Sequence, residues 1–259
     1  MKRIVILAAS FNNQTNQFFT VLSRTLLQLI VFICIGFGVL ALSCSRFNAF
    51  DQRLREGIIE YNVTFPYLDD SNNMMASLLP DKMYLHFKKD RFSSELATVG
   101  GLFKNRFVSN QNEMQLVHQM KIFKKKLESD YNETSVHRQL MNMPNLTIIE
   151  TNEVDSIAGY ACKKAIGIYD HIALPEMIIY YTDEINVDSP NWCTQFHPIK
   201  GVLMQYEIEQ FGIRMRFRAN SVQALKIEEE KLAPEPGYDR VSPDQLQVEI
   251  EELLNSFNM

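Results

Sequence analysis

The chain has 259 residues, of which 46% are hydrophobic, with 26 Lys and Arg against 31 Asp and Glu. Lys2, Arg3 and Arg24 are the only charged side chains before Cys44, so residues 44–259 hold 23 basic and 31 acidic residues, a net charge of −8. This acidic part is poorly suited to nucleic acid, because binding phosphates requires clustered Lys and Arg. Its length fits one domain, or one domain with a small appendage.

The first 43 residues have the organisation of a secretory signal. An apolar run from Thr25 to Ser43 follows a positively charged segment and ends in small residues. The sequence Ala41-Leu42-Ser43-Cys44 resembles a lipobox, where bacterial lipoproteins are cleaved and the new N-terminal cysteine is acylated. We therefore expect a signal peptide over 1–43 and lipid attachment at Cys44.

Two alternatives to the lipid anchor stay open. The apolar run is close to the roughly 20 residues that span a bilayer, so it could be a retained helix. It could also be a signal that is removed without acylation. All three readings carry the rest of the chain across the inner membrane. Ser45 stands where an inner-membrane retention signal has Asp, which favours lipid anchorage in the outer membrane, facing the periplasm.

The first half of residues 44–259 predicts a series of short strands. Residues 44–56 are predicted to be a lipidated tether, after which Ile59, Tyr61, Val63 and Phe65 alternate with polar residues, as in a half-buried strand. Further strands are predicted over 83–87, 92–99, 103–109 and 114–123. Residues 130–143 are polar and compatible with a helical excursion.

The second half gives clearer signals. Strands are predicted over 146–151, 160–169, 177–181, 202–210, 213–219 and 222–227, with a loop over 188–198 that holds Trp192, the only tryptophan. The chain then ends in a helix, for which Ser242, Pro243 and Gln245 provide the N-cap and capping box. The apolar residues of this helix share one face at helical spacing: Leu246, Ile250, Leu253 and Phe257.

Residues 202–219 predict a hairpin with a definite register. If Phe211 and Gly212 form the loop, one face is polar and charge-paired and the other is apolar. A shift of one residue would expose the apolar face, so burial fixes the register. The expected pairs are Glu209 with Arg214, Glu207 with Arg216 and Gln205 with Arg218 on one face, and Ile208 with Met215, Tyr206 with Phe217 and Met204 with Ala219 on the other.

Three segments carry a resemblance to a known family. Residues 155–165, DSIAGYACKKA, resemble the I-x-G-Y-x-C-x-K-A signature of small exported proteins of the GLPGLI type and of related lipoproteins built on a domain of unknown function. Residues 180–185, YYTDEI, and 236–238, PGY, match later elements of these proteins. Residues 198–203, PIKGVL, depart from the naming GLPGLI motif, which favours the unknown-function branch. The resemblance covers residues 153–238.

The resemblance implies a fold similar to that of the lipoprotein carriers of the Gram-negative envelope. That fold is a strongly curved antiparallel sheet, an unclosed half-barrel with helices over its open side, and its concave face can hold acyl chains. The many short strands independently favour an antiparallel sheet. We expect an α+β, mostly β fold, with the curved β domain over 57–241 and a C-terminal amphipathic helix over 242–259. The expected ligand groove on the concave face consists of Ile59, Tyr61, Leu85, Ile166 and Ile179.

Few residues suggest catalysis. Cys162 and Cys193 are either a disulfide or two separate buried thiols. His171, Cys193 and His197 could contribute to a metal site, but a zinc site needs three or four converging ligands, and these are more simply loop residues. The sequence contains no H-E-x-x-H, no G-x-S-x-G and no glycine-rich phosphate loop. We therefore expect no catalytic residue, metal or cofactor.

The sequence thus predicts an envelope lipoprotein that acts as a non-enzymatic binding or structural module. The expected partners are the membrane, through the N-terminal lipid, and a lipid or other apolar ligand on the concave sheet face. One alternative is a hydrolase or metal-dependent enzyme of unknown substrate. Another is a docking subunit of an envelope complex, in which the sheet serves only as a contact surface.

Overall fold

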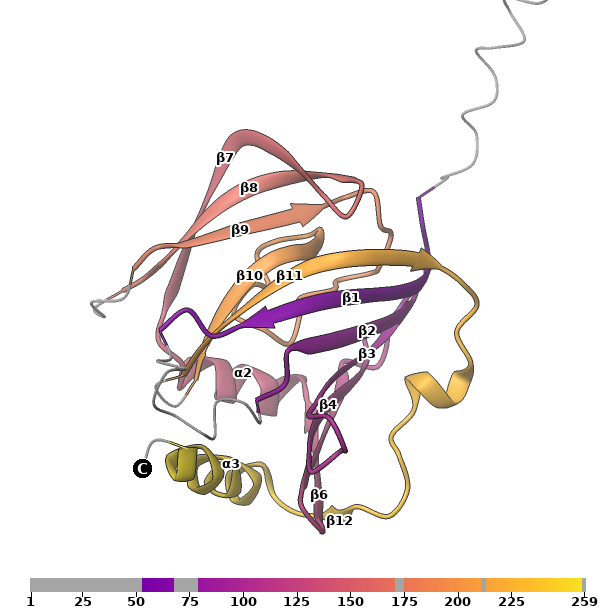
Figure 1. Ribbon diagram of the computed structural model, residues 1–259, viewed down its shortest axis with the longest axis vertical. Coiled ribbons are helices and arrows are strands. Elements are labelled where there is room, and N and C mark those ends of the chain that lie inside the picture. The colour runs from indigo at the N-terminus through magenta and orange to yellow at the C-terminus, as the bar shows by residue number, and fades with distance from the viewer. Residues whose placement is uncertain (1–52, 68–78, 171–174, 211–212, 258–259) are drawn as a thin grey trace, which may run out of the picture. The chain divides into compact units, whose positions relative to one another are not determined.

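The computed structural model describes residues 53–67, 79–170, 175–210 and 213–257 (Figure 1). The predicted signal peptide, Cys44 and most of the predicted tether lie outside these residues, as does His171. The described residues belong to a compact unit, Arg53–Met259. None of its described helices is long and apolar enough to cross a membrane.

Twelve strands of the described chain form one sheet, in the order β12-β6-β5-β4-β3-β2-β1-β11-β10-β9-β8-β7. The strands are β1 (Glu56–Thr64), β2 (Lys82–Lys88), β3 (Arg91–Ala97), β4 (Phe103–Asn110), β5 (Gln115–Ile122), β6 (Lys125–Asn132), β7 (Leu146–Ile157), β8 (Tyr160–Tyr169), β9 (Met177–Thr182), β10 (Val202–Gln210), β11 (Ile213–Ala224) and β12 (Asp239–Arg240). All neighbours are antiparallel except β12 and β6, which are parallel. The sheet is curved and its edge strands, β7 and β12, do not pair with each other (Figure 1). The predicted mostly β fold with an unclosed sheet is confirmed.

Two α-helices contact β6 near one edge of the sheet. In α2 (Glu133–Met141), the Asn132 side chain accepts a hydrogen bond from the Ser135 backbone N–H and the Ser135 hydroxyl accepts one from the Asn132 N–H, which forms a capping box. In α3 (Pro243–Phe257), the Ser242 hydroxyl accepts from the Gln245 N–H at 3.2 Å. The predicted C-terminal helix is confirmed, and its Leu246 is fully buried in the core.

One face of the sheet carries the main core. The strand register places Ile59, Leu85, Ser94 and Phe107 side by side across β1, β2, β3 and β4, so they point to the same side. We call this side the inner face. Residues 183–201, between β9 and β10, pack against it through Ile185 and Val187, which belong to the same hydrophobic cluster. We call residues 183–201 the covering segment. Because the sheet and its clusters lie within Arg53–Met259, this part has a core of its own and can be studied alone.

The predicted register of the β10–β11 hairpin is confirmed. Glu209 faces Arg214, Glu207 faces Arg216, and Ile208 faces Met215. The charged face is nevertheless not simply a solvent-exposed row. Arg214 and Glu207 are both buried and bonded to each other on the side opposite Ile208 and Met215.

Two boundaries differ from those expected. The predicted tether overlaps the fold, because Leu54 donates its N–H to the Glu184 carbonyl at 3.3 Å and accepts from Asn186 at 2.7 Å. Strand β6 was not predicted. Its inward positions are Leu127, Ser129 and Tyr131, and the polar Ser129 interrupts the apolar alternation on which the prediction depends.

Candidate ligand-binding cavity

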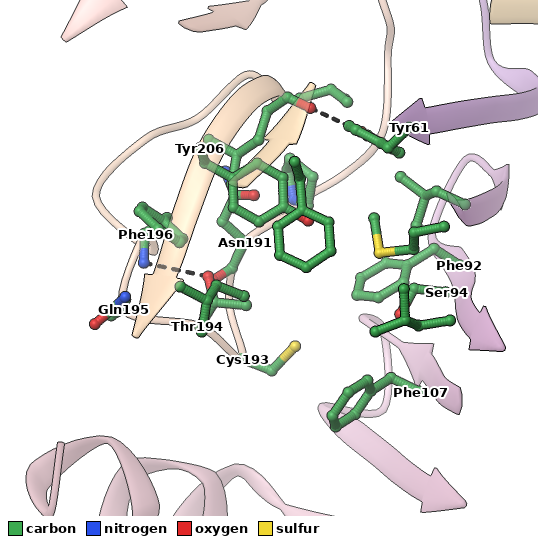
Figure 2. A pocket seen from close by; sticks show the side chains of 18 of the residues that line it. Tyr61, Phe92, Ser94, Phe107, Asn191, Cys193, Thr194, Gln195, Phe196 and Tyr206 are labelled. Atoms are coloured by element: carbon green, nitrogen blue, oxygen red, sulfur yellow. Dashed lines mark hydrogen bonds between the residues drawn. The ribbon is translucent and has the colours of Figure 1, made fainter. Parts of the chain in front are cut away.

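A cavity of about 250 Å³ lies between the inner face of the sheet and the covering segment. Residues of β1 to β5, β10 and β11 form most of its wall, and Gln139, Leu140 and Met143 border it from α2 and the turn after it. Figure 2 shows Phe92, Ser94 and Phe107 on one side of this space, with Tyr206 and Phe196 on the other. The cavity thus lies beside the main core, where the sheet and the covering segment meet.

Aromatic rings form the wall on the β10 side. Tyr206 stacks on Phe217 with ring centroids 4.9 Å apart and an angle of 13° between the planes. The rings of Tyr61 and Phe196 approach Tyr206 edge-on, with centroids at 6.1 and 5.5 Å. Such aromatic pairs add to the stability that burial alone provides and keep each ring in a fixed orientation. This wall is therefore preformed.

The covering segment is held by side-chain hydrogen bonds. Asn191 donates from Nδ2 to the carbonyls of Ile199 and Gly201, at 2.7 and 3.0 Å. Trp192 donates from Nε1 to the Ser109 hydroxyl on β4, at 2.9 Å. Gly201 leaves room for the return into β10, because a Cβ there would lie 2.7 Å from the Thr182 carbonyl oxygen. Trp192 was the only sequence signal that this loop contacts the core.

None of the described residues on the cavity wall carries a charged side chain. Beside the cavity, the ring of His118 stacks on Phe107, and its Nε2 lies 2.6 Å from the Oδ1 of Asn105. Burial lowers the pKa of His118 to about 3, so the imidazole is neutral near pH 7. Burial likewise raises the pKa of the Cys193 thiol to about 12, which keeps it protonated and a poor nucleophile. The arrangement therefore suits binding of an uncharged group better than acid–base or nucleophilic chemistry.

The structure separates the five predicted groove residues. Tyr61 and Leu85 line the cavity. Ile59 and Ile179 have no exposed surface and are packed within the core without bordering the cavity. Ile179 pairs with Ala165, whereas Ile166 pairs with Ile178. Ile166 therefore lies on the face of the sheet opposite to Ile179, and the prediction is wrong for Ile166.

The position of Ile166 follows from close packing between β8 and β9. A Cβ on Gly167 would lie 2.6 Å from the Met177 side chain, so a small residue is required at this inward position. Ala165, also inward, is fully buried. The inward positions 165 and 167 of β8 thus hold small residues, and the larger Ile166 between them faces outward beside Ile149 and Ile178, which are 47% and 45% exposed. Sequence periodicity assigns the larger residues to the core, so the prediction exchanged the inward and outward faces of this strand.

The other candidate residues do not form a shared site in the described structure. Cys162 and Cys193 are free thiols, so the disulfide that the sequence allowed is not formed. Cys193 lines the cavity, whereas His197 is exposed, and His171 lies outside the described residues. Among the described residues, no group of three or more His, Cys, Asp and Glu could hold a metal ion.

Comparisons with known proteins give only distant similarities. No family model matches the chain, and no curated protein matches its sequence. Two crystal forms of PNGF-II match with 14% and 16% identity over 76% of this chain, each with a TM-score of 0.47. The chain spans about a third of PNGF-II, 33% and 32% of the two chains. A β-barrel-like protein of a domain of unknown function from Brucella abortus matches with 8% identity and a TM-score of 0.29, over 67% of this chain and 99% of that one.

These similarities do not indicate what this chain binds or does, because the identities and TM-scores are too low. The resemblance to the GLPGLI group and its lipoprotein relatives stays a prediction from the sequence segments that carry it.

Proposed function

We propose that this chain is a non-enzymatic binding module that holds an apolar ligand in the cavity between the curved sheet and the covering segment. The observation that carries the proposal is the cavity itself, with its aromatic and aliphatic wall and its few neutral polar groups. Ligand sites in proteins are usually concave, mostly apolar and largely preformed.

The size of the cavity limits the ligand. Its volume of about 250 Å³ is slightly below the roughly 300–1,000 Å³ that is typical of ligand pockets. The cavity therefore suits one narrow apolar molecule, or one acyl chain of a lipid, and is too small for a complete two-chain lipid.

The proposed setting is the bacterial cell envelope, with the module anchored through a lipid on Cys44 and facing the periplasm from the outer membrane. This part rests on the sequence, in which a positive segment, an apolar run and Ala41-Leu42-Ser43-Cys44 follow one another. An anchored module of this kind would present its cavity close to a lipid surface.

The direct test is mass spectrometry of organic extracts from purified residues 45–259. We expect a bound apolar molecule in the wild type and its loss in Ser94→Phe, because Ser94 lines the cavity and a phenyl ring there would fill it. The matched control is Ser156→Phe, since Ser156 is exposed on the edge strand β7. Thermal unfolding followed by circular dichroism would show that both variants are folded. Equal extracts from both variants would contradict the proposal.

A further inference from the structure

The Tyr206 hydroxyl is a polar group without a partner on the wall of an apolar cavity. Its ring is fixed by Phe217, Tyr61 and Phe196, as described above. Yet in the part of the chain that the structure describes, no group donates to or accepts from its hydroxyl. Burial raises the pKa of Tyr206 far above its usual value, so the phenol is neutral and remains able to donate a hydrogen bond.

Tyr61, on the same wall, shows the contrast. Its hydroxyl donates to the Leu203 carbonyl at 2.7 Å, so this phenol is satisfied within the protein. Tyr206 is half-buried on the cavity wall, so a ligand that displaces water there preserves a hydrogen bond to this hydroxyl only if it carries a polar atom. Tyr206 is therefore the phenol on this wall with hydrogen-bonding capacity left for a ligand.

The charge of the ligand is limited by the same wall. No Lys, Arg, Asp or Glu of the described part of the chain lines the cavity, and the nearby His118 is neutral. An ionised carboxylate or phosphate inside would lose its hydration and meet no opposite charge, which is strongly unfavourable. Anionic head groups are thus excluded from the interior, although neutral hydrogen-bonding groups are not.

From these observations we infer that the ligand is an uncharged molecule with a narrow apolar body and one hydrogen-bonding oxygen, of an alcohol, ester or ketone, which bonds to the Tyr206 hydroxyl. This inference rests on the proposed function and names the class of ligand. Ser94 on β3 carries a second hydroxyl that borders the cavity and has no hydrogen-bond partner in the described structure. It could hold the same oxygen only if the ligand lay against the opposite wall.

The test compares ligands with equal chains on residues 45–259: octane, 1-octanol and octanoate at pH 8, titrated against the fluorescence of Trp192. The variant Tyr206→Phe removes only the hydroxyl and keeps the ring packing. We expect it to weaken octanol binding roughly twofold to tenfold, the effect of one neutral hydrogen bond, and to leave octane binding unchanged. Octanoate should bind the wild type more than tenfold more weakly than octanol.

Tyr84→Phe is the matched control, since it removes an exposed phenolic hydroxyl that does not line the cavity. It should leave the ratio of octanol to octane affinity unchanged. If Tyr206→Phe leaves that ratio unchanged, or if only Ser94→Ala lowers it, the assignment to Tyr206 is wrong. Octanoate binding as tightly as octanol would overturn the uncharged class. Failure of every ligand to bind the wild type would overturn the proposed function together with this inference.

Discussion

Arg214 donates the hydrogen of its Nε to Glu207 although both side chains are almost completely buried, with exposed fractions of 2% and 5%. The second oxygen of Glu207 accepts from Arg216 Nε at 2.7 Å, and Arg214 Nη2 donates to the Pro175 carbonyl at 3.0 Å. The pair lies on the outer side of the β10–β11 hairpin. A buried ion pair contributes little net stability when intact, but loss of one partner is costly.

Glu207→Gln should therefore destabilise the domain strongly. The substitution keeps the shape of the side chain but leaves the buried Arg214 charge uncompensated, and we expect a loss of about 3–5 kcal/mol in the free energy of unfolding. Urea denaturation of residues 45–259 measures it. Arg216→Ala is the control, because Arg216 is 45% exposed and its loss should cost less than about 1 kcal/mol. Similar losses for both variants would show that burial of the pair does not matter.

Acid should destabilise the fold through His118. Because burial lowers the pKa of His118 from 6.5 to about 3, the unfolded state binds a proton in this window and the folded state does not. Stability therefore falls as the pH drops from about 6.5 towards 3, and at pH 5 the loss is on the order of 2 kcal/mol. Urea denaturation at pH 7 and pH 5 tests this, because carboxylates titrate mostly below pH 5.

The control for the pH dependence is His118→Gln. It should remove most of the difference between pH 7 and pH 5, whatever its effect on stability at pH 7. A smaller part should persist, because burial also lowers the pKa of His86. If the variant shows the same difference as the wild type, His118 is not the responsible group.

The β7–β8 turn offers a stabilising substitution. Ala158 and Gly159 connect the strands with φ angles of 50° and 85°, the two positive values that a type I′ turn requires. Asn tolerates this conformation better than Ala, so Ala158→Asn should raise the free energy of unfolding by roughly 0.5 kcal/mol. Gly159→Ala should lower it by about 1 kcal/mol. Ala161→Asn, placed in the strand itself, should give no gain; if it stabilises as much, the turn is not the cause.

Anchorage through Cys44 predicts a clear change in localisation. Cys44→Ser should either release the domain from membranes or leave the uncleaved precursor, as seen by membrane fractionation and by the mass of the N-terminal peptide. Stable attachment needs more than one acyl chain, so that peptide should carry several in the wild type. Cys34→Ser, within the apolar run, should have no effect. Native protein with an unmodified Cys44 and residues 1–43 intact would disprove the anchor.

Sequence reasoning succeeded where a residue's neighbours are local. The β10–β11 register could be derived because both strands alternate charged and apolar residues around a short loop, so one pairing satisfies both faces. The C-terminal helix was equally accessible, since capping residues and helical spacing are local signals.

The cavity could not be derived in this way. It depends on the covering segment reaching from β9 across to Ser109 on β4, a contact between residues 83 positions apart that no periodicity encodes. The same limit explains Ile166, whose direction is set by the size of Met177 on the neighbouring strand rather than by its own sequence pattern. The free hydroxyl of Tyr206 likewise depends on described neighbours that are far from it in sequence, such as Tyr61.

β1, the first strand in the described part of the chain, lies in the middle of the sheet. β1 pairs with β2, which follows it closely, and with β11, which is among the last strands in sequence. While the chain is being made, one edge of β1 therefore lacks its partner until Ala224 has been added, and Ile59, Tyr61 and Val63 are left without their core. Unpaired apolar edges tend to join other chains. The topology thus postpones completion of the central part of the sheet until residues 213–224 are available to pair with β1.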